Sequence, residues 1–173
     1  EYTLSDMAKD AVALLEVLNI KKAHIIGASM GGMITQIIAL DHPEKVLTIT
    51  PIMTSPGMQN DSLSGPTEEL LEAYKKSFVH NVRGRIEDGV VEIYRQLTGS
   101  RFPFDEQKFR DKLKPVISHG NNPFALHVDA VGASPDRTSR LNEIKVPALI
   151  IHGTEDAILP LDHGMAVADG IND

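Results

Sequence analysis

The sequence Gly27-Ala28-Ser29-Met30-Gly31 lies between a run of residues typical of a strand and a run typical of a helix. The residues before it, 23–26, form a short apolar run of the kind found in buried strands of parallel sheets. The residues after it place apolar side chains at helical spacing up to Leu40, and Asp41-His42-Pro43 ends that pattern. A serine flanked by glycines between a strand and a helix predicts a sharp turn at a strand end, which favours an α/β architecture.

Other parts of the chain repeat this alternation of helix and strand. Apolar residues at three- and four-residue spacing predict an amphipathic helix over 4–19, with Thr3 or Ser5 as its N-cap. Further apolar runs predict a strand over 46–52 and a buried strand over 146–153, followed by a helix that begins at Leu161. Helices alternating with short apolar strands are typical of a parallel sheet with helical connections.

The composition changes between residues 56 and 140, where charge rises and continuous apolar runs disappear. Seven of the eight aromatic residues fall here, and helical patterns cover 67–80, 85–98, 105–119 and 124–133. We therefore expect a core segment over 1–55, an inserted helical lid over 56–140 and a second core segment over 141–173. The aromatic side chains either cover an apolar pocket or form the lid's own small core, and the pattern leaves both open.

Charge and residue usage exclude several functions for this chain. With 17 basic and 24 acidic residues, the net charge of −7 offers no electrostatic footprint for a nucleic acid. The 173 residues contain no cysteine, which excludes disulfides, thiolate metal sites and a thiol nucleophile and suits a cytoplasmic location. The histidines form no metal-binding pattern, so we expect neither metal nor cofactor. Glycines and polar residues interrupt the most apolar stretch, 25–40, so we expect no membrane span.

In this context the G-x-S-x-G pattern is typical of a nucleophile elbow, which presents a serine hydroxyl at the edge of a sheet. Ser29 is therefore the candidate nucleophile. The helix that starts there has free N–H groups in its first turn, so the backbone N–H of Met30 is a candidate oxyanion donor. The loop fits neither a P-loop nor a dinucleotide fingerprint, because both the Lys-Ser or Lys-Thr pair and the G-x-G-x-x-G spacing are absent. An incidental serine in a tight turn is the structural alternative.

A serine nucleophile needs a base, and in this architecture an acid and then a histidine follow the serine along the chain. Asp156 comes directly after the predicted strand 146–153, where a carboxylate reaches the same sheet edge as Ser29, and it is the candidate acid. Glu155 is the neighbouring alternative, and an acidic pair capping the next helix is the structural one. His163, the sole histidine beyond Asp156, follows it too closely in sequence to bridge acid and serine.

These segments resemble the α/β-hydrolase superfamily of lidded serine esterases and lipases, and most closely its aclacinomycin methylesterase-like group, which cleaves carboxylic methyl esters. The resemblance is carried by residues 2–18, 24–32, 42–46 and 141–160. It implies that Ser29 is the nucleophile and that Asp156 orients the base. The chain looks like an internal fragment, because relatives carry strands and a His-Gly turn before this region, and the catalytic histidine after it. His119-Gly120 and His152-Gly153 share the letters of that turn but not its place.

The resemblance and the motif together predict hydrolysis of a small-molecule carboxylic ester through an acyl-enzyme intermediate. Thioesterase, acyltransferase and perhydrolase reactions use the same residues and stay open, as does a non-catalytic binding protein that kept the elbow. Epoxide hydrolases and haloalkane dehalogenases are disfavoured, because their elbow carries Asp where Ser29 stands. Strands without their neighbours expose edges and apolar faces, so we expect the 173-residue piece alone to be unstable or oligomeric.

Overall fold

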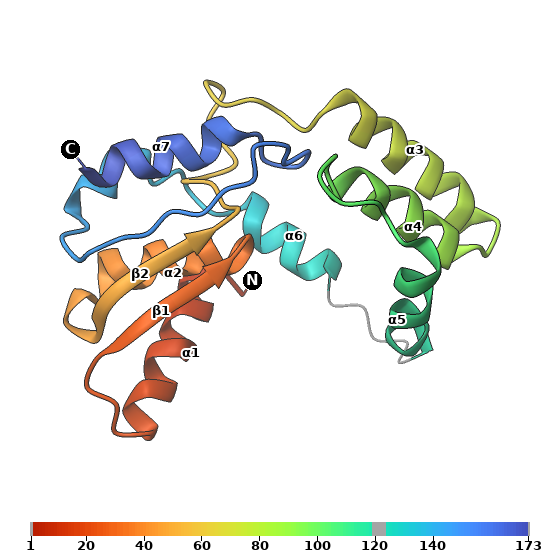
Figure 1. The fold of residues 1–173 in the computed structure, drawn as a ribbon. Coiled ribbons are helices and arrows are strands. Elements are labelled where there is room, and N and C mark those ends of the chain that lie inside the picture. The colour runs from red at the N-terminus through yellow and green to blue at the C-terminus, as the bar shows by residue number, and fades with distance from the viewer. Residues whose placement is uncertain (1, 119–123, 173) are drawn as a thin grey trace. The chain divides into compact units, whose positions relative to one another are not determined.

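The computed structural model describes residues 2–118 and 124–172 of the chain (Figure 1). It contains two compact units. Unit 1 comprises Glu1–Ser64, Phe124–Gly153 and Leu161–Asp173, and unit 2 comprises Gly65–Pro123 and Thr154–Pro160. Unit 1 holds the sheet and unit 2 is helical, so the mixed α/β class predicted from the sequence is confirmed.

The sheet of unit 1 is parallel, as predicted. Strand β1 (Ala23–Ala28) pairs with β2 (Val46–Ile52) in a register that sets Ala28 opposite Ile52. The predicted strand over 146–153 pairs with the other side of β2, but only through two parallel bridges, Ile49 to Ala148 and Ile52 to Ile151. The carboxyl ends of all three segments therefore lie at the same edge of the sheet.

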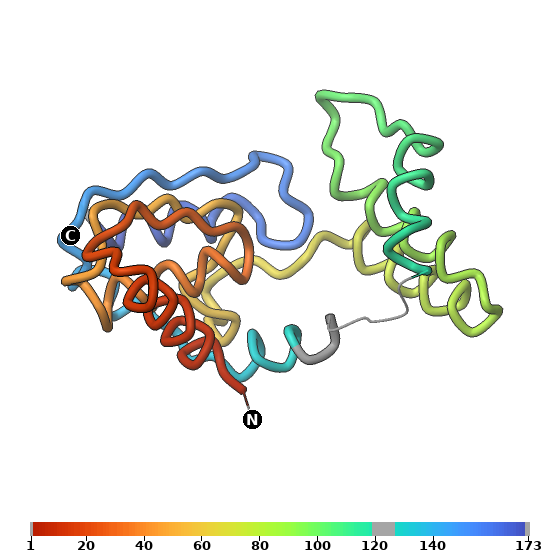
Figure 2. The backbone as a smooth tube through the Cα atoms, turned by 90° about the horizontal axis from the view of Figure 1, so that it is seen from below, coloured from red at the N-terminus to blue at the C-terminus, as the bar shows by residue number. Residues whose placement is uncertain are grey.

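Two helices of unit 1 connect to the strands as the sequence predicts. Helix α1 (Leu4–Val17) begins at Thr3, which forms a capping box with Asp6. Helix α2 (Met30–Asp41) packs against α1 and both strands, and Figure 2 follows this course along the backbone. A short 3₁₀ turn, η1 (Pro43–Lys45), then leads into β2. Proline at the start of η1 ends α2, because it cannot continue the helix.

The remaining elements of unit 1 come from the second half of the chain. They are α6 (Phe124–Gly132), the 3₁₀ helix η2 (Thr138–Glu143) and α7 (Leu161–Asn172). Helix α7 packs against η2, where Leu141 is fully buried and approaches Gly170. The core joins these elements to α1, α2 and β2 through Leu4, Ala8, Val12, Met33, Ile37, Ile38, Val46, Ile49, Ala130, Leu141 and Ile144.

The apolar core lies on one face of the sheet, and the other face is open among the described residues. Burial alternates along β1, and the side chain of Ile26 is 68% exposed. In the third segment Leu149 is 60% exposed. The prediction that these apolar runs are fully buried is therefore wrong for Ile26 and Leu149. The physical reason is that the helices of unit 1 that contact β1 and β2 cover only one face.

Unit 2 contains three of the predicted helices, α3 (Glu68–Val82), α4 (Ile86–Leu97) and α5 (Glu106–Ser118). Helices α3 and α4 approach closely at Gly89, where a Cβ would lie 2.8 Å from Ser77 Oγ. The ring of Phe109 on α5 packs against Tyr94 on α4, with centroids 4.6 Å apart. Aromatic rings of the insertion thus pack against one another within unit 2, although none of the described ones is fully buried. Whether the others cover an apolar pocket stays a prediction.

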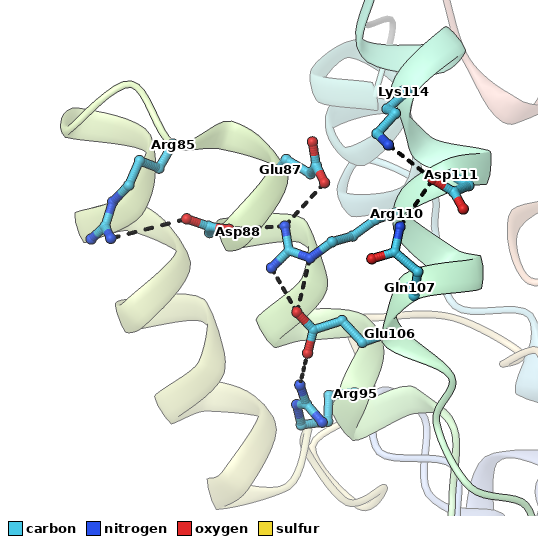
Figure 3. Close-up of polar contacts among 9 residues, drawn as sticks. All are labelled: Arg85, Glu87, Asp88, Arg95, Glu106, Gln107, Arg110, Asp111 and Lys114. Atoms are coloured by element: carbon cyan, nitrogen blue, oxygen red, sulfur yellow. Dashed lines mark hydrogen bonds and ion pairs between the residues drawn. The ribbon is translucent and has the colours of Figure 1, made fainter.

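Charged side chains also hold α5 against α4. Arg110 on α5 forms ion pairs with Glu87 and Asp88 in the first turn of α4 and with Glu106 one turn before it (Figure 3). Arg95 on α4 reaches the same Glu106 carboxylate. Arg110 and then Arg95 hold the pKa of Glu106 below its usual value. This cluster compensates for α5 having no fully buried side chain among its described residues.

The compact units divide the chain at 64/65, 123/124, 153/154 and 160/161, and α6 belongs to unit 1. Whether the segment over 56–140 acts as a lid stays a prediction. Among the described residues no helix is long and apolar enough to cross a bilayer.

Candidate active site

Ser29 occupies the turn between β1 and α2 with an unusual backbone conformation. Its φ of 53° and ψ of −119° place it at positive φ, where residues other than glycine are rare. The residue is exposed, and its hydroxyl makes no capping hydrogen bond to the helix that follows. A strained residue of this kind costs about 1–3 kcal/mol and persists only where its surroundings hold it. The sharp turn predicted from the sequence is therefore present, with the serine at its apex.

The glycines around Ser29 have different roles. A Cβ on Gly27 would lie 2.1 Å from the carbonyl oxygen of Gly31, so only glycine allows β1 and α2 to meet there. A Cβ on Gly31 would meet no described atom within 4 Å, whereas one on Gly32 would lie 2.6 Å from Thr54 Cβ. Close approach therefore requires glycine at position 27 but not at position 31. The close contact on the helix side belongs to Gly32 instead.

Both backbone polar atoms of Ser29 are bound by residues at the end of β2. The Ser29 N–H donates to the carbonyl oxygen of Ile52 at 2.9 Å. The Ser29 carbonyl accepts a hydrogen bond of 2.8 Å from Thr54 Oγ1, and α2 adds its first N–H donors, from Gly32 and Met33. These bonds hold the strained turn, and Thr54 was not identified from the sequence. Its only signal was a polar residue two positions after the end of an apolar strand.

The backbone N–H of Met30 lies in the first turn of α2. Within the part of the chain that the structure describes, no acceptor takes this N–H. A helix start leaves such groups without intrahelical partners and gives them partial positive charge. The group thus remains open to an oxygen that develops negative charge, as the candidate role requires.

Asp156 lies in unit 2, in the loop Thr154–Pro160 that follows the third sheet segment. Its Oδ1 accepts hydrogen bonds of 2.9 Å from the backbone N–H groups of Ile158 and Leu159. These bonds close a tight turn and fix the direction of the side chain. The two candidate residues thus belong to different units: Ser29 follows β1 in unit 1, and Asp156 is set by its own loop in unit 2.

Glu155, the alternative acid, binds within unit 2. Its carboxylate accepts from the hydroxyl of Ser100 at 2.6 Å and from the Ser100 N–H at 2.5 Å. These bonds hold the pKa of Glu155 below its usual value. Glu155 thereby connects the loop 154–160 to the turn after α4, which is a structural role.

The histidines of unit 1 that the structure describes include two with clear structural partners. His24 Nδ1 lies 2.8 Å from Thr48 Oγ1 on the neighbouring strand. His163 is 5% exposed, with Nδ1 2.9 Å from Ser55 Oγ and Nε2 2.8 Å from the carbonyl oxygen of Ser64. His42 ends α2 as its C-cap. His119 lies outside the described residues, and His152-Gly153 forms the end of the third sheet segment, after its last bridge at Ile151.

A buried polar network lies behind the turn that carries Ser29. Gln36 on α2 donates from Nε2 to the carbonyl oxygen of Ser55 at 3.0 Å, and Arg137 Nε approaches Gln36 Oε1 at 3.4 Å. Arg137 is 4% exposed and also donates to Ser134 Oγ. Burial lowers the pKa of Arg137 to about 10. The network ties α2 to the segments after β2 and before η2.

The described residues contain no group of three His, Asp or Glu side chains that could hold a metal ion.

The profile of the alpha/beta hydrolase fold family matches residues 1–172 of this chain. The chain therefore belongs to the α/β-hydrolase family, which confirms the resemblance seen in its sequence.

Curated relatives of two kinds are similar to the chain. The rhodomycin D methylesterase DauP of Streptomyces sp. strain C5 is 29% identical over 193 residues, covering 98% of this chain and 63% of the relative. A 2-hydroxy-6-oxononadienedioate/2-hydroxy-6-oxononatrienedioate hydrolase of Paraburkholderia phymatum is 30% identical over 165 residues, covering 91% of this chain and 54% of the relative. The chain thus spans between about half and two thirds of the length of these relatives.

Among solved structures, the enol-lactonase from Burkholderia xenovorans LB400 superposes with a TM-score of 0.72 at 22% identity. The match covers 98% of this chain and 61% of that structure. At this identity the likeness concerns the fold alone.

Proposed function

We propose that the full-length protein is a serine hydrolase that cleaves a carboxylic ester through an acyl-enzyme intermediate. In this proposal Ser29 attacks the ester carbonyl, and the Met30 N–H stabilises the oxyanion that forms. Asp156 orients a histidine that takes the proton from Ser29 and later gives it to the leaving alcohol. Water then takes the place of the alcohol. The histidine removes a proton from the water as it attacks the acyl carbonyl, and Ser29 regains a proton from the histidine as the carboxylic acid leaves.

The observation that carries the proposal is the conformation of Ser29. An exposed serine at positive φ, at the carboxyl end of a parallel strand and the start of a helix, is the arrangement expected of a nucleophile elbow, and it supports Ser29 as the nucleophile. The Ser29 hydroxyl makes no cap hydrogen bond to α2, so helix capping does not explain why a strained residue stands at this position. Family membership and the methylesterase among the relatives support an ester as the substrate.

The order of the sheet segments supports Asp156 as the acid. Ala28 and Ile151 both pair with Ile52, so the segments that lead to Ser29 and to Asp156 flank the end of β2. Loops that follow neighbouring parallel strands leave the same edge of a sheet, where ligands bind in open α/β folds.

The base is proposed to be a histidine outside residues 1–173. His163, the sole histidine after Asp156, is buried with both ring nitrogens at hydrogen-bond distance from Ser55 and Ser64. A ring held in this way is not available to take a proton from an exposed serine.

The second group of relatives favours another candidate reaction on the same residues. The hydrolases of 2-hydroxy-6-oxo-dienoates resemble the chain as closely as the methylesterase does, with 30% identity for the one from Paraburkholderia phymatum. In this alternative the hydrolysed bond is a carbon–carbon bond. Kinetic assays of the full-length protein with an aryl methyl ester and with a 2-hydroxy-6-oxo-dienoate separate the two candidates.

The proposed function is tested with a fluorophosphonate probe, which reacts with activated serines. We expect the full-length protein to be labelled stoichiometrically and Ser29→Ala to lose all labelling while keeping its melting temperature. Absence of labelling in the unchanged protein, or labelling that survives in Ser29→Ala, would overturn the proposal and favour a non-catalytic member of the family.

A further inference from the structure

The carbonyl group of Ser29 is held by a side chain from the neighbouring strand end, and this contact bears on the oxyanion donor. Thr54 Oγ1 donates to the Ser29 carbonyl oxygen at 2.8 Å, from a side chain that is 1% exposed. We propose that Thr54 is a positioning residue that fixes the direction of the Met30 N–H. This inference rests on the serine hydrolase function proposed above.

The geometry of the peptide unit connects these two groups. The carbonyl of Ser29 and the N–H of Met30 belong to the same planar trans peptide, so they point in opposite directions. Binding the carbonyl to Thr54 therefore turns the N–H away from the buried threonine. An oxyanion donor acts only when it lies about 2.7–3.1 Å from the developing charge, so a small rotation of this peptide reduces its effect.

The peptide between Ser29 and Met30 must be stabilised by hydrogen bonds from its surroundings, because the backbone of Ser29 is strained. The φ of Ser29 is 53°, and a free chain would relax toward negative φ and rotate the following peptide. The Ser29 N–H is bound to Ile52, and its carbonyl accepts from the Thr54 hydroxyl as well as from the N–H groups of Gly32 and Met33. The end of β2 therefore fixes the peptides on both sides of the serine together with the first turn of α2, and Thr54 supplies the side-chain contact to the Ser29 carbonyl. A hydroxyl that donates to a carbonyl also polarises the N–H of the same peptide, which makes it a stronger donor.

Thr54 is itself held in place. The preceding residue, Met53, has a φ of 42° and donates its N–H to the carbonyl oxygen of Ile151 at 2.8 Å. The Thr54 side chain fills the space beside Gly32, where a Cβ would lie 2.6 Å from Thr54 Cβ. These contacts hold the Thr54 side chain beside the turn, where its hydroxyl donates to the Ser29 carbonyl.

The test compares three variants of the full-length protein. Thr54→Val removes the hydroxyl at nearly constant volume, and Thr54→Ser keeps the hydroxyl but loses the methyl group. Thr35→Val is the matched control, because Thr35 is as buried as Thr54. Its hydroxyl donates to the carbonyl of Gly31, one turn earlier in α2, and not to the carbonyl of Ser29. For each variant, kcat and KM with a p-nitrophenyl ester and the melting temperature are measured.

We expect Thr54→Val to lower kcat by about 10- to 100-fold and to leave KM within about 3-fold. This loss is smaller than the loss of about 10²- to 10³-fold in kcat that follows removal of an oxyanion donor itself. Affinity for a trifluoromethyl ketone, whose adduct places an oxyanion in the site, falls in parallel, whereas affinity for the carboxylate product does not. Thr54→Ser restores kcat to within about 3-fold of the unchanged protein, and Thr35→Val stays within about 2-fold. The amide NMR signal of Met30 shifts in Thr54→Val and returns in Thr54→Ser.

Three results would overturn the inference. The first is an unchanged kcat or an unchanged Met30 signal in Thr54→Val. The second is an equal loss in Thr54→Val and Thr35→Val, which would show a general loss of stability. The third is turnover that does not depend on Ser29, shown with Ser29→Ala. This third result refutes the proposed function, and the inference falls with it, whereas the first two refute the role of Thr54 alone.

Discussion

Gly32 and Thr54 touch at the start of α2, so closely that a Cβ on Gly32 would lie 2.6 Å from Thr54 Cβ and 2.8 Å from Thr54 Cγ2. The threonine side chain occupies the space that any other residue at position 32 would need. The contact joins the first turn of α2 to the end of β2, at the turn that carries Ser29. A substitution that alters this contact is therefore expected to change the position of Ser29.

Gly32→Ala is predicted to destabilise the full-length protein by about 1–3 kcal/mol, because the added methyl group overpacks a site with no free volume. Gly31→Ala is the matched control one residue away, where the new Cβ meets no described atom within 4 Å. We expect Gly31→Ala to be neutral or to stabilise by up to about 1 kcal/mol, since alanine favours the helix. Urea unfolding of both variants checks the difference, and equal effects would contradict it.

Asp156 and Glu155 are neighbours with different partners, so their amide variants should differ in effect. Asp156→Asn keeps the oxygen that accepts from Ile158 and Leu159 but removes the charge. We expect it to lower kcat by about 10³- to 10⁴-fold with the melting temperature unchanged, because the base loses its orienting carboxylate. Glu155→Gln is expected to lower kcat by less than about 10-fold. The reverse ranking in a kinetic assay would move the acid to Glu155.

Glu155 also predicts a dependence on pH. Its pKa is lowered by the hydrogen bonds from Ser100, so this contact stabilises the folded state above the usual pKa of a glutamate and is lost as pH falls through the lowered value. The stability difference between the unchanged protein and Glu155→Gln is therefore expected to be constant from pH 6 to 8 and to shrink below about pH 4. Chemical denaturation at several pH values measures it, and a difference that grows on acidification would be inconsistent with this contact.

The elements that position the site could be predicted from periodicity. The strand over 46–52 has the predicted bounds, and the apolar run before Ser29 extends by only two residues, to Ala28. Short continuous apolar runs that alternate with helical patterns indicate a parallel sheet, and the turn at Ser29 followed from its two neighbouring elements. Local patterns were sufficient here because helices and strands space their apolar residues differently along the chain.

Contacts between segments distant in sequence could not be predicted in the same way. Thr54 binds a carbonyl 25 positions before it, and Gln36 meets Arg137 across 101 positions. Neither contact leaves a periodic signal, since each joins single side chains from segments far apart in the sequence. The G-x-S-x-G pattern also drew attention to Gly31, whereas the close contact on the helix side belongs to Gly32. The exposure of Ile26 depends on which layers surround the sheet, and a single apolar run does not report that.

Arg110 is predicted to be the main polar link between α4 and α5, because it pairs with Glu87 and Asp88 across the helix interface. Arg110→Met should destabilise unit 2 by about 1 kcal/mol and speed amide hydrogen exchange over 106–118. Lys114→Met is the control, since the ion pair that Lys114 forms among the described residues joins it to Asp111 on its own helix, and it should leave exchange nearly unchanged. The effect of Arg110→Met should weaken at high salt. Equal exchange in the two variants would assign the packing to the aromatic residues instead.

Gln36 and Arg137 are predicted to be energetically coupled, because each is buried and loses a partner when the other is replaced. Gln36→Met and Arg137→Met should each destabilise by about 2 kcal/mol, and the double variant by about 1 kcal/mol less than their sum. Burial lowers the pKa of Arg137 to about 10, so the side chain is charged in the folded and the unfolded state below that pH. Its contribution to stability can rise with pH only above about 10, where the folded state alone releases the proton. Urea unfolding of the four proteins at pH 6 and pH 9 should therefore give the same coupling, and strict additivity would show that the two side chains act separately.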